Sequence, residues 1–294
     1  DVRHRFEERK LVDRAKGLLM RATQMSEEEA FRLLRTSSVQ GNLRVGQVSR
    51  RVIDAARDAE ALNRAGGLRM LSQRIVKLYA LLAAGVEVAG CTALLALSVE
   101  RVQESLSLLA RGLSKPTYGD LLEAVERTWR ELQPALAQPA DAARLAALDE
   151  LAQRLLSQAE QLVAALEAAG AGAPLHVINV CGRQRMPSQR LAKLALLGVL
   201  LPGQDAQAFK DEALRTAEAF EQALGYLNAA PLSSPEIREA LEAAGREWAR
   251  MLDGVREARL APGQLALAAA SESLLELFDR LTERYERSMQ MLAG

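Results

Sequence analysis

Hydrophobic residues recur along most of the chain at spacings of three and four positions, which is the period of an amphipathic α-helix. Gly, Pro and polar residues divide this pattern into runs that predict eight long helices between residues 56 and 292. The expected helices cover about 56–84, 91–112, 119–136, 141–169, 175–200, 205–229, 234–258 and 263–292. Because four such helices with short connections form an antiparallel bundle, we expect one bundle over residues 56–172 and another over 173–294.

A phrase of twelve residues occurs twice, as NRAGGLRMLSQR at 63–74 and as NVCGRQRMPSQR at 179–190. The same offset of 116 residues aligns Lys77 with Lys193. Each phrase is followed further on by a helical run with one tryptophan. The sequence therefore predicts two related bundles, which could face each other about a pseudo-two-fold axis.

The helix expected around the first phrase is apolar on two sides. One side is typical bundle core and consists of Leu68, Leu71, Ile75, Leu78 and Leu82. The second side consists of Leu62, Gly66, Arg69, Gln73, Val76 and Ala80, and its counterpart of Ile178, Gly182, Arg185, Gln189, Ala192 and Leu196. Since a helix that is apolar on both sides is packed on both sides, we expect this second stripe to form a seam between the bundles.

Arg69 and Arg185 lie in the middle of the expected seam, where an uncompensated guanidinium would cost several kcal/mol. No acidic residue occurs between Glu60 and Glu87, or between Glu167 and Asp205. The compensating charge must come from another helix, from solvent or from a bound anion. If the repeats face each other, the two arginines converge, and a flat oxyanion suits two planar guanidinium groups. Alternatively, each arginine pairs with a carboxylate of a neighbouring helix or reaches water.

Residues 1–55 form a separate basic head. Residues 1–53 contain 12 Lys and Arg against 7 Asp and Glu, a net charge of +5, whereas the remaining residues carry −5. This asymmetry favours the head as the part that meets nucleic acid.

Three short helices are expected in the head. Leu11, Ala15, Leu18 and Leu19 form an apolar stripe on the first. Ser26 and Glu29 form a capping box that predicts a helix start near residue 27, Gly41 ends that helix, and Asn42 is expected to cap the next, at about 43–61. Three short helices bury little surface by themselves, so the head is expected to rely on a partner.

The composition agrees with an all-α fold, because Ala, Leu, Glu, Arg and Gln dominate and aromatic residues make up only 4%. Residues 78–99 are the nearest approach to a membrane span, but Glu87 and nearby glycines interrupt them, which favours two buried helices joined by a turn. The chain opens on charged residues rather than on a secretory signal, so we expect a cytoplasmic protein without membrane contact. Cys91 and Cys181 have no metal-ligand spacing and are expected to be small core residues.

Catalytic chemistry is not indicated by the sequence. The chain contains two histidines, His4 and His176, and shows neither a nucleophile–base pattern nor a phosphate-binding loop. We therefore expect no enzyme activity, no catalytic residue, no metal ion and no cofactor.

The repeated phrase resembles the motif N-x-A-G-x-x-R-M-x-S-x-R of the sensor domain in nitrate-responsive sensor kinases and of the related domain in type IV pilus chemoreceptors. The first copy matches it at Asn63, Ala65, Gly66, Arg69, Met70, Ser72 and Arg74. The second matches at Asn179, Gly182, Arg185, Met186, Ser188 and Arg190, with Cys181 in place of the usual alanine. In the nitrate sensors of that family, one arginine from each of two paired four-helix bundles holds a single nitrate.

This resemblance implies that Arg69 and Arg185 bind nitrate or nitrite, with both halves of a dimer fused in one chain. It implies backbone contacts from Gly66 and Gly182, and supporting roles for Arg74, Arg190, Ser72 and Ser188. Pro187, which replaces Leu71 of the first copy, departs from strict symmetry, because proline would bend the helix or delay its start. Pilus-type members share the motif without a secure ligand.

The head resembles the ANTAR domain, a three-helix RNA-binding module of bacterial antiterminators. The resemblance rests on Leu11, Ala15, Lys16, Gly17, Leu18, Leu19, Met20, Ser26, Glu29, Ala30, Phe31, Leu33, Leu34, Arg35, Arg44, Val48 and Ile53, with Ser37 in place of an alanine. It implies a domain that pairs with a second copy and binds two successive leader RNA hairpins. Candidate RNA contacts are Lys16, Arg35, Arg44 and Arg50, each of which could equally be a solvated surface charge.

In known nitrate antiterminators the RNA module follows the sensor, whereas here it comes first. The third head helix is therefore expected to continue into the first sensor helix unless Gly66 or Gly67 breaks it. The sequence as a whole predicts an anion-responsive antiterminator, with a helical interaction scaffold lacking a small ligand as the alternative.

Overall fold

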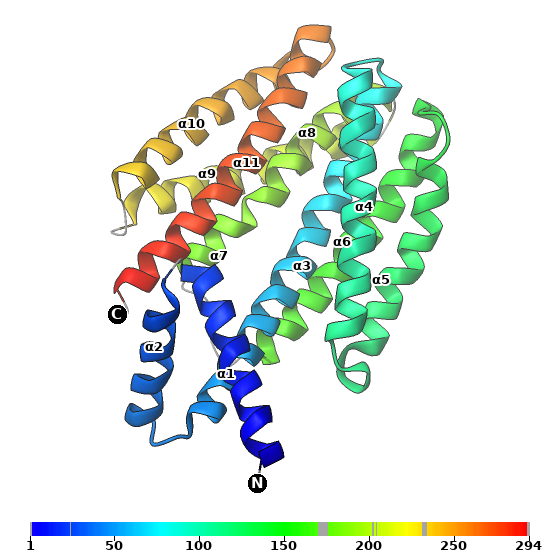
Figure 1. Cartoon of the computed structure of the whole chain (residues 1–294). Helices are drawn as coiled ribbons and strands as arrows, with labels where there is room; N and C mark the ends of the chain where they lie inside the picture. The colour runs from blue at the N-terminus through cyan, green and yellow to red at the C-terminus, as the bar shows by residue number, and fades with distance from the viewer. Residues whose placement is uncertain are drawn as a thin grey trace. The chain divides into compact units, whose positions relative to one another are not determined.

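The computed structural model describes residues 2–23, 25–169, 176–201, 203, 205–230 and 234–292. These residues form helices and connecting turns, without any strand (Figure 1), which confirms the predicted all-α fold. The chain divides into two compact units, one formed by Asp1–Asn63 and the other by Arg64–Leu292. The predicted boundary at residues 172 and 173 lies outside the described residues, as do the side chains of His4 and His176.

The first unit contains α1 (Val2–Thr23), α2 (Glu27–Gln40) and the beginning of α3 (Val45–Ala83). Its small core joins the three helices through Ala15, Leu34, Val48 and Ile53. The predicted capping box is present, since Glu29 N donates to Ser26 Oγ and Ser26 N donates to a Glu29 carboxylate oxygen. Phe6, Met20, Phe31, Leu33 and Val39 remain exposed, in agreement with a domain too small to bury all of its apolar surface.

The expectation that Asn42 caps the third helix is wrong. Gly41 ends α2 as predicted, its N–H donating to Ser37 O, but Asn42 follows in the turn with a left-handed backbone at φ 49°. The helix begins only at Val45, where Gln47 Oε1 accepts from Arg44 N at 2.9 Å. Asparagine tolerates the left-handed conformation better than most residues, so its turn preference outweighs its capping preference here.

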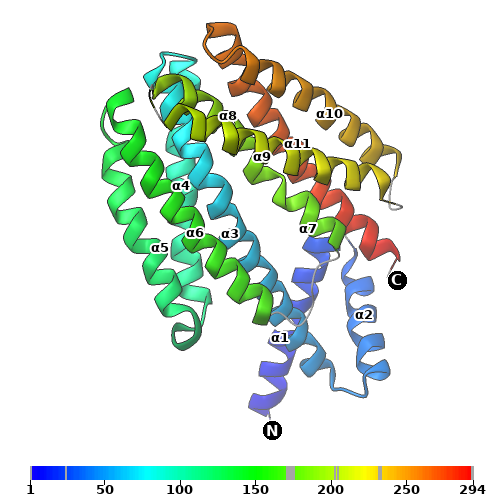
Figure 2. The ribbon, with the colours of Figure 1, turned by 180° about the vertical axis from the view of Figure 1, so that it is seen from behind.

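The second unit contains the remainder of α3 and two sets of helices that lie side by side in both views (Figures 1 and 2). The first set continues with α4 (Val88–Gly112), α5 (Lys115–Leu136), a short 3-10 turn (Ala142–Arg144) and α6 (Leu145–Ala169). The second set consists of α7 (His176–Arg183), α8 (Arg185–Leu200), α9 (Asp205–Ala229), α10 (Pro235–Arg256) and α11 (Ala261–Leu292). These bounds lie close to the predicted ones.

The core of the first set follows the predicted apolar stripe, except that Leu82 at its end is only half-buried. Leu68, Leu71, Ile75 and Leu78 of α3 are all buried, as are both free cysteines. In the second set Phe220 stacks on Trp248 with ring centroids 4.0 Å apart and meets Phe278 edge-on, which joins α9, α10 and α11.

Residues 78–99 form the end of α3 and the start of α4, joined by the expected turn, in which Gly85 and Glu87 have positive φ. The expectation that both helices are buried is wrong for the start of α4, where Val88 and Leu97 are each 52% exposed, because only one side of this helix packs on the core. None of the described helices carries an apolar run long enough to cross a bilayer.

Two helix junctions bear on the repeated phrase. In the first copy α3 continues through Gly66 and Gly67, so the third head helix and the first sensor helix are one helix. In the second copy the helix is interrupted at Gln184, between α7 and α8. Pro187 lacks the N–H that a continuous helix would donate to Arg183 O, which accounts for the interruption and for the predicted departure from symmetry.

Candidate functional site

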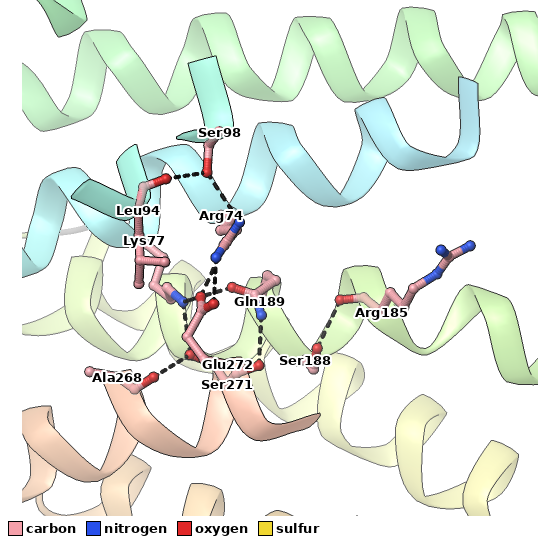
Figure 3. A network of polar contacts seen from close by, with 10 residues as sticks. All are labelled: Arg74, Lys77, Leu94, Ser98, Arg185, Ser188, Gln189, Ala268, Ser271 and Glu272. Atoms are coloured by element: carbon pink, nitrogen blue, oxygen red, sulfur yellow. Dashed lines mark hydrogen bonds and ion pairs between the residues drawn. The ribbon is translucent and has the colours of Figure 1, made fainter. Parts of the chain in front are cut away.

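The seam between the two repeats contains a buried polar network (Figure 3). Lys77 of α3 is fully buried, and its ammonium donates to Gln189 Oε1 at 2.7 Å, Ser271 Oγ at 2.9 Å and Glu272 Oε1 at 2.6 Å. All three donors of the ammonium are thereby satisfied, and all three acceptors come from the second repeat. Arg74 forms a bidentate contact with Glu272, in which Nε donates to Oε1 at 3.0 Å and Nη2 donates to Oε2 at 2.5 Å.

An equivalent ion pair joins a lysine of the second repeat to a carboxylate of the first. Lys193, which is the counterpart of Lys77, is also fully buried, and its Nζ lies 2.6 Å from Asp149 Oδ1 of α6. Each lysine of the phrase-bearing helices therefore pairs with a carboxylate on the last helix of the other repeat. This reciprocity supports the predicted seam and the related arrangement of the two sets. The sequence did not indicate these partners, because the paired residues lie far apart in the chain.

Burial and the neighbouring charges act in opposite directions on the pKa values of Glu272 and Lys77. Burial pushes the pKa of the Glu272 carboxyl upward, but Lys77 and Arg74 outweigh burial and hold that pKa below its usual value. Burial lowers the pKa of Lys77, against the opposing effect of Glu272. The seam therefore depends on Glu272 carrying its negative charge.

Acid is expected to weaken the seam through Glu272. A carboxyl whose pKa is lowered on folding stabilises the fold above its unfolded pKa, and that contribution is lost as the pH falls through the folded value. We expect Glu272→Gln to cost stability at neutral pH, and the cost to shrink once the pH falls below 4.5, the ordinary value for this group. Urea unfolding of both proteins over this pH range measures the difference, and a cost that stays constant down to the acid limit would contradict the assignment.

Arg69, the first predicted anion ligand, lies half-buried on α3. Its Nε is buried and finds no acceptor among the described residues. Burial lowers the pKa of Arg69, and the positive charges of Arg183 and Arg185 lower it further, against the opposing effects of Glu160 and Glu167. A cationic side chain is thus held in a partly dry position near two other cations, without a hydrogen-bond partner for its buried N–H.

Arg185, the second predicted ligand, is partly paired already. Its Nη1 lies 3.0 Å from Asp279 Oδ1 of α11, and its Nε donates to Gly182 O at 2.9 Å. Asp279 is 43% exposed, so this ion pair lies at the edge of the seam. In Figure 3 the Arg185 guanidinium points away from the network around Lys77. Of the two alternatives for the arginines, pairing with a carboxylate therefore describes Arg185, whereas Arg69 forms no ion pair with the described residues.

In each copy of the phrase, the glycine lies next to the guanidinium of the arginine three residues later. A Cβ placed on Gly66 would lie 3.6 Å from Arg69 Nη2, and a Cβ on Gly182 would lie 3.6 Å from Arg185 Nη2. The match shows that both arginines fold back over the preceding turn in the same way. An alanine would only touch the guanidinium, whereas a larger side chain would displace it.

The residues predicted to support the site take structural contacts. Ser72 and Ser188 donate to the carbonyl oxygens of Arg69 and Arg185, at 2.7 and 2.8 Å. Arg74 belongs to the Glu272 network, and Arg190 pairs with Glu212 of its own repeat at 2.7 Å. The two serines fix the helical turn that presents each ligand candidate, and neither Arg74 nor Arg190 is free.

Arg183 is a further candidate residue, which the sequence did not indicate. It lies at the end of α7, where its Nη2 is 3.2 Å from Glu167 Oε1, and among nearby charges it has the largest effect on the Arg69 pKa. Its counterpart in the first phrase is Gly67, so the repeat pattern gave no signal for it. The surroundings of Arg69 are consequently less symmetric than the repeated motif indicates.

The predicted RNA contacts differ in accessibility. Arg35, Arg44 and Arg50 are exposed. Lys16, by contrast, links α1 to α2, with its Nζ 2.7 Å from Glu27 Oε1 and 2.9 Å from Asp13 Oδ1. The hydrogen bonds that the Lys16 ammonium donates to these two carboxylates raise its pKa.

The described residues form a helical head with exposed arginines and a unit of two related helical sets with cations at their seam. A family model described as the ANTAR domain matches residues 1–53. A second, described as type IV pili methyl-accepting chemotaxis transducer N-term, matches residues 54–153 and 169–274. The protein belongs to this second family, whose model covers most of the chain, and carries an ANTAR domain before it.

The resemblances to the ANTAR domain and to the type IV pilus chemoreceptor domain are thereby confirmed. ANTAR domains bind RNA in antitermination, and neither family is catalytic. Comparison with curated proteins and comparison with solved structures each found no match.

Proposed function

We propose that the protein is a cytoplasmic antiterminator that binds nitrate or nitrite between its two repeats and binds leader RNA through its head. The main observation in favour of anion binding is that the buried Nε of Arg69 lacks an acceptor among the described residues. A small planar oxyanion would supply that acceptor and would offset the mutual repulsion of Arg69, Arg183 and Arg185.

Binding requires little rearrangement at Arg185. Its contact with Asp279 is a partly exposed ion pair, which contributes less than about 1 kcal/mol. An anion could therefore share the Arg185 guanidinium with Asp279 or replace the carboxylate at low cost. Arg183, held by Glu167 at the end of α7, would add a third positive charge close to the anion.

Communication with the head would run through α3. This one helix carries Val48 and Ile53, which belong to the core of the first unit, and Arg69, which belongs to the second. An anion that binds one conformation better than another shifts the population toward it, and a helix shared by both units would transmit that preference. The exposed apolar residues of the head support pairing of two heads on RNA, and hence a homodimer.

RNA binding by the head is tested by a gel shift with the full chain and an RNA of two successive hairpins, with and without nitrate. We expect the RNA to be retained and its affinity to change when nitrate is added. The double variant Arg35→Gln, Arg50→Gln removes two exposed positive charges and is expected to weaken retention and to lower its salt dependence. Arg250→Gln, which removes an exposed charge on α10, is the matched control. Absence of retention under both conditions would contradict RNA control by this head.

The scaffold alternative retains one supporting observation, the existing ion pair of Arg185 with Asp279. On that reading the seam needs no ligand and the two sets serve a protein partner. Nitrate titration separates the two functions, because a scaffold would give no binding heat.

A further inference from the structure

An apolar groove opens in the second repeat, away from the candidate anion site. It has a volume of about 520 Å³ and lies between α8, α9 and the end of α10. Its apolar lining includes Leu191, Leu194, Ala195, Val199, Leu214 and Val255. Leu214 is 61% exposed although it borders this groove. The volume lies within the range of about 300–1,000 Å³ that is typical of small-molecule sites.

The first repeat fills the corresponding space with its own side chain. Tyr79 is the counterpart of Ala195 at the same offset of 116 residues, and Tyr79 is almost fully buried. Its hydroxyl donates to Pro139 O at 3.4 Å and accepts from Asp141 N at 3.1 Å, in the connection between α5 and α6. In the second repeat the equivalent connection, between α10 and α11, contributes Ala258 and Arg259 to the groove lining.

A second replacement enlarges the groove. Leu82 of the first repeat corresponds to Gly198 of the second, which also lines the groove. A Cβ on Gly198 would meet Phe209 Cβ at 3.8 Å, an ordinary contact, so the backbone there does not require glycine. Two larger side chains of the first repeat, those of Tyr79 and Leu82, are thus replaced in the second by Ala195 and Gly198, which line the groove.

Positive charge borders the groove. Lys210, Arg256 and Arg259 belong to its lining, which contains no carboxylate. Arg256 pairs with Asp253 at 2.5 Å, whereas Lys210 and Arg259 form no ion pair within the described part of the chain. An apolar interior with a cationic border complements a molecule that has an apolar body and one negative end.

We propose that this groove binds a small amphiphile with an anionic head, of the class of medium-chain carboxylates. The apolar body lies against Leu191, Leu194 and Ala195, and the carboxylate lies at the border between Lys210 and Arg259. Helical periodicity places these α8 residues on a different face from Gln189 and Lys193, which belong to the seam. The site is therefore distinct from the candidate anion site and does not rest on it.

Calorimetric titration of the full chain with decanoate tests the proposal, with decyltrimethylammonium as the probe of opposite charge. We expect saturable binding of decanoate and at least tenfold weaker binding of the cation. Ala195→Tyr combined with Gly198→Leu, which copies the first repeat, is expected to abolish decanoate binding. Because these replacements are buried, circular dichroism and thermal unfolding verify the fold. Lys210→Gln with Arg259→Gln, both exposed, provides a second variant and is expected to weaken binding at least tenfold.

Several outcomes would overturn the proposal. Equal binding of both probes, or decanoate binding that survives in the filled variant, would show that the groove is not an anionic amphiphile site. Self-association that disappears in the filled variant, without decanoate binding, would make the groove an interface between copies of the chain. Nitrate titration of the filled variant is expected to match the unmodified protein, so failure here is distinguishable from failure of the anion site.

Discussion

Replacement of Glu272 by alanine is expected to lower the free energy of unfolding by about 3–5 kcal/mol, the cost of breaking a buried ion pair from one side. Glu272 accepts from both Lys77 and Arg74, which lie buried on the opposite repeat. Its removal would leave two cations in the seam without their counter-charge. Chemical denaturation at neutral pH measures the change.

Glu276→Ala is the matched control, because Glu276 lies one turn further along α11 and pairs with Arg280 in solvent. This surface pair is expected to contribute less than about 1 kcal/mol. The double variant Lys77→Met, Glu272→Leu is expected to recover only part of the loss, because a well-packed apolar pair can replace the Lys77–Glu272 ion pair while Arg74 still lacks its carboxylate. Equal effects of Glu272→Ala and Glu276→Ala would show that the seam network does not hold the repeats together.

Replacement of Arg69 by methionine is expected to weaken nitrate binding by about 10- to 150-fold, the loss of a hydrogen bond to a charged group. The same variant is expected to be more stable than the unmodified protein without anion, by about 1 kcal/mol or more. The physical reason is that Arg69 is desolvated and repelled by Arg183 and Arg185, while its buried Nε lacks an acceptor among the described residues.

Arg190→Met is the control for Arg69→Met. Arg190 belongs to the same repeated phrase, and its Nε is likewise buried without an acceptor among the described residues, but its Nη2 pairs with Glu212. Its replacement is therefore expected to reduce stability and to leave nitrate affinity largely unchanged. Thermal unfolding with and without nitrate measures both quantities. Destabilisation by Arg69→Met in the absence of anion would indicate a structural arginine and would count against a ligand role.

Much of the fold could be predicted because local signals agree with the final packing. The Ser26 capping box, the end of α2 at Gly41 and the interruption near Pro187 each follow from backbone chemistry within a few residues. The prediction that Asn42 caps α3 was wrong because asparagine favours both helix caps and left-handed turns, and it adopts the left-handed turn here. The predicted helix bounds in both repeats lie close to the observed ones for the same reason, because the apolar periodicity stops at the Gly, Pro and polar residues that end the helices.

Of the candidate site, only the residues that recur in the repeated phrase could be predicted from the sequence. The phrase singled out Arg69 and Arg185, but gave no indication that Asp279 pairs with Arg185 or that Arg183 approaches Arg69. Those contacts depend on how α11 and α7 pack, and no residue spacing in the sequence predicts that packing. The partners of Lys77 were equally hidden, because any of several carboxylates on the opposite repeat could have met it.

The stoichiometry of nitrate binding, measured by calorimetric titration of the full chain, tests the central claim most directly. A site shared by Arg69 and Arg185 predicts one nitrate per chain, with binding lost or strongly weakened in Arg69→Met. Two equivalents per chain would mean that each arginine binds alone, and absence of binding heat would mean that the seam holds no anion. Either result would contradict a single anion site between the repeats.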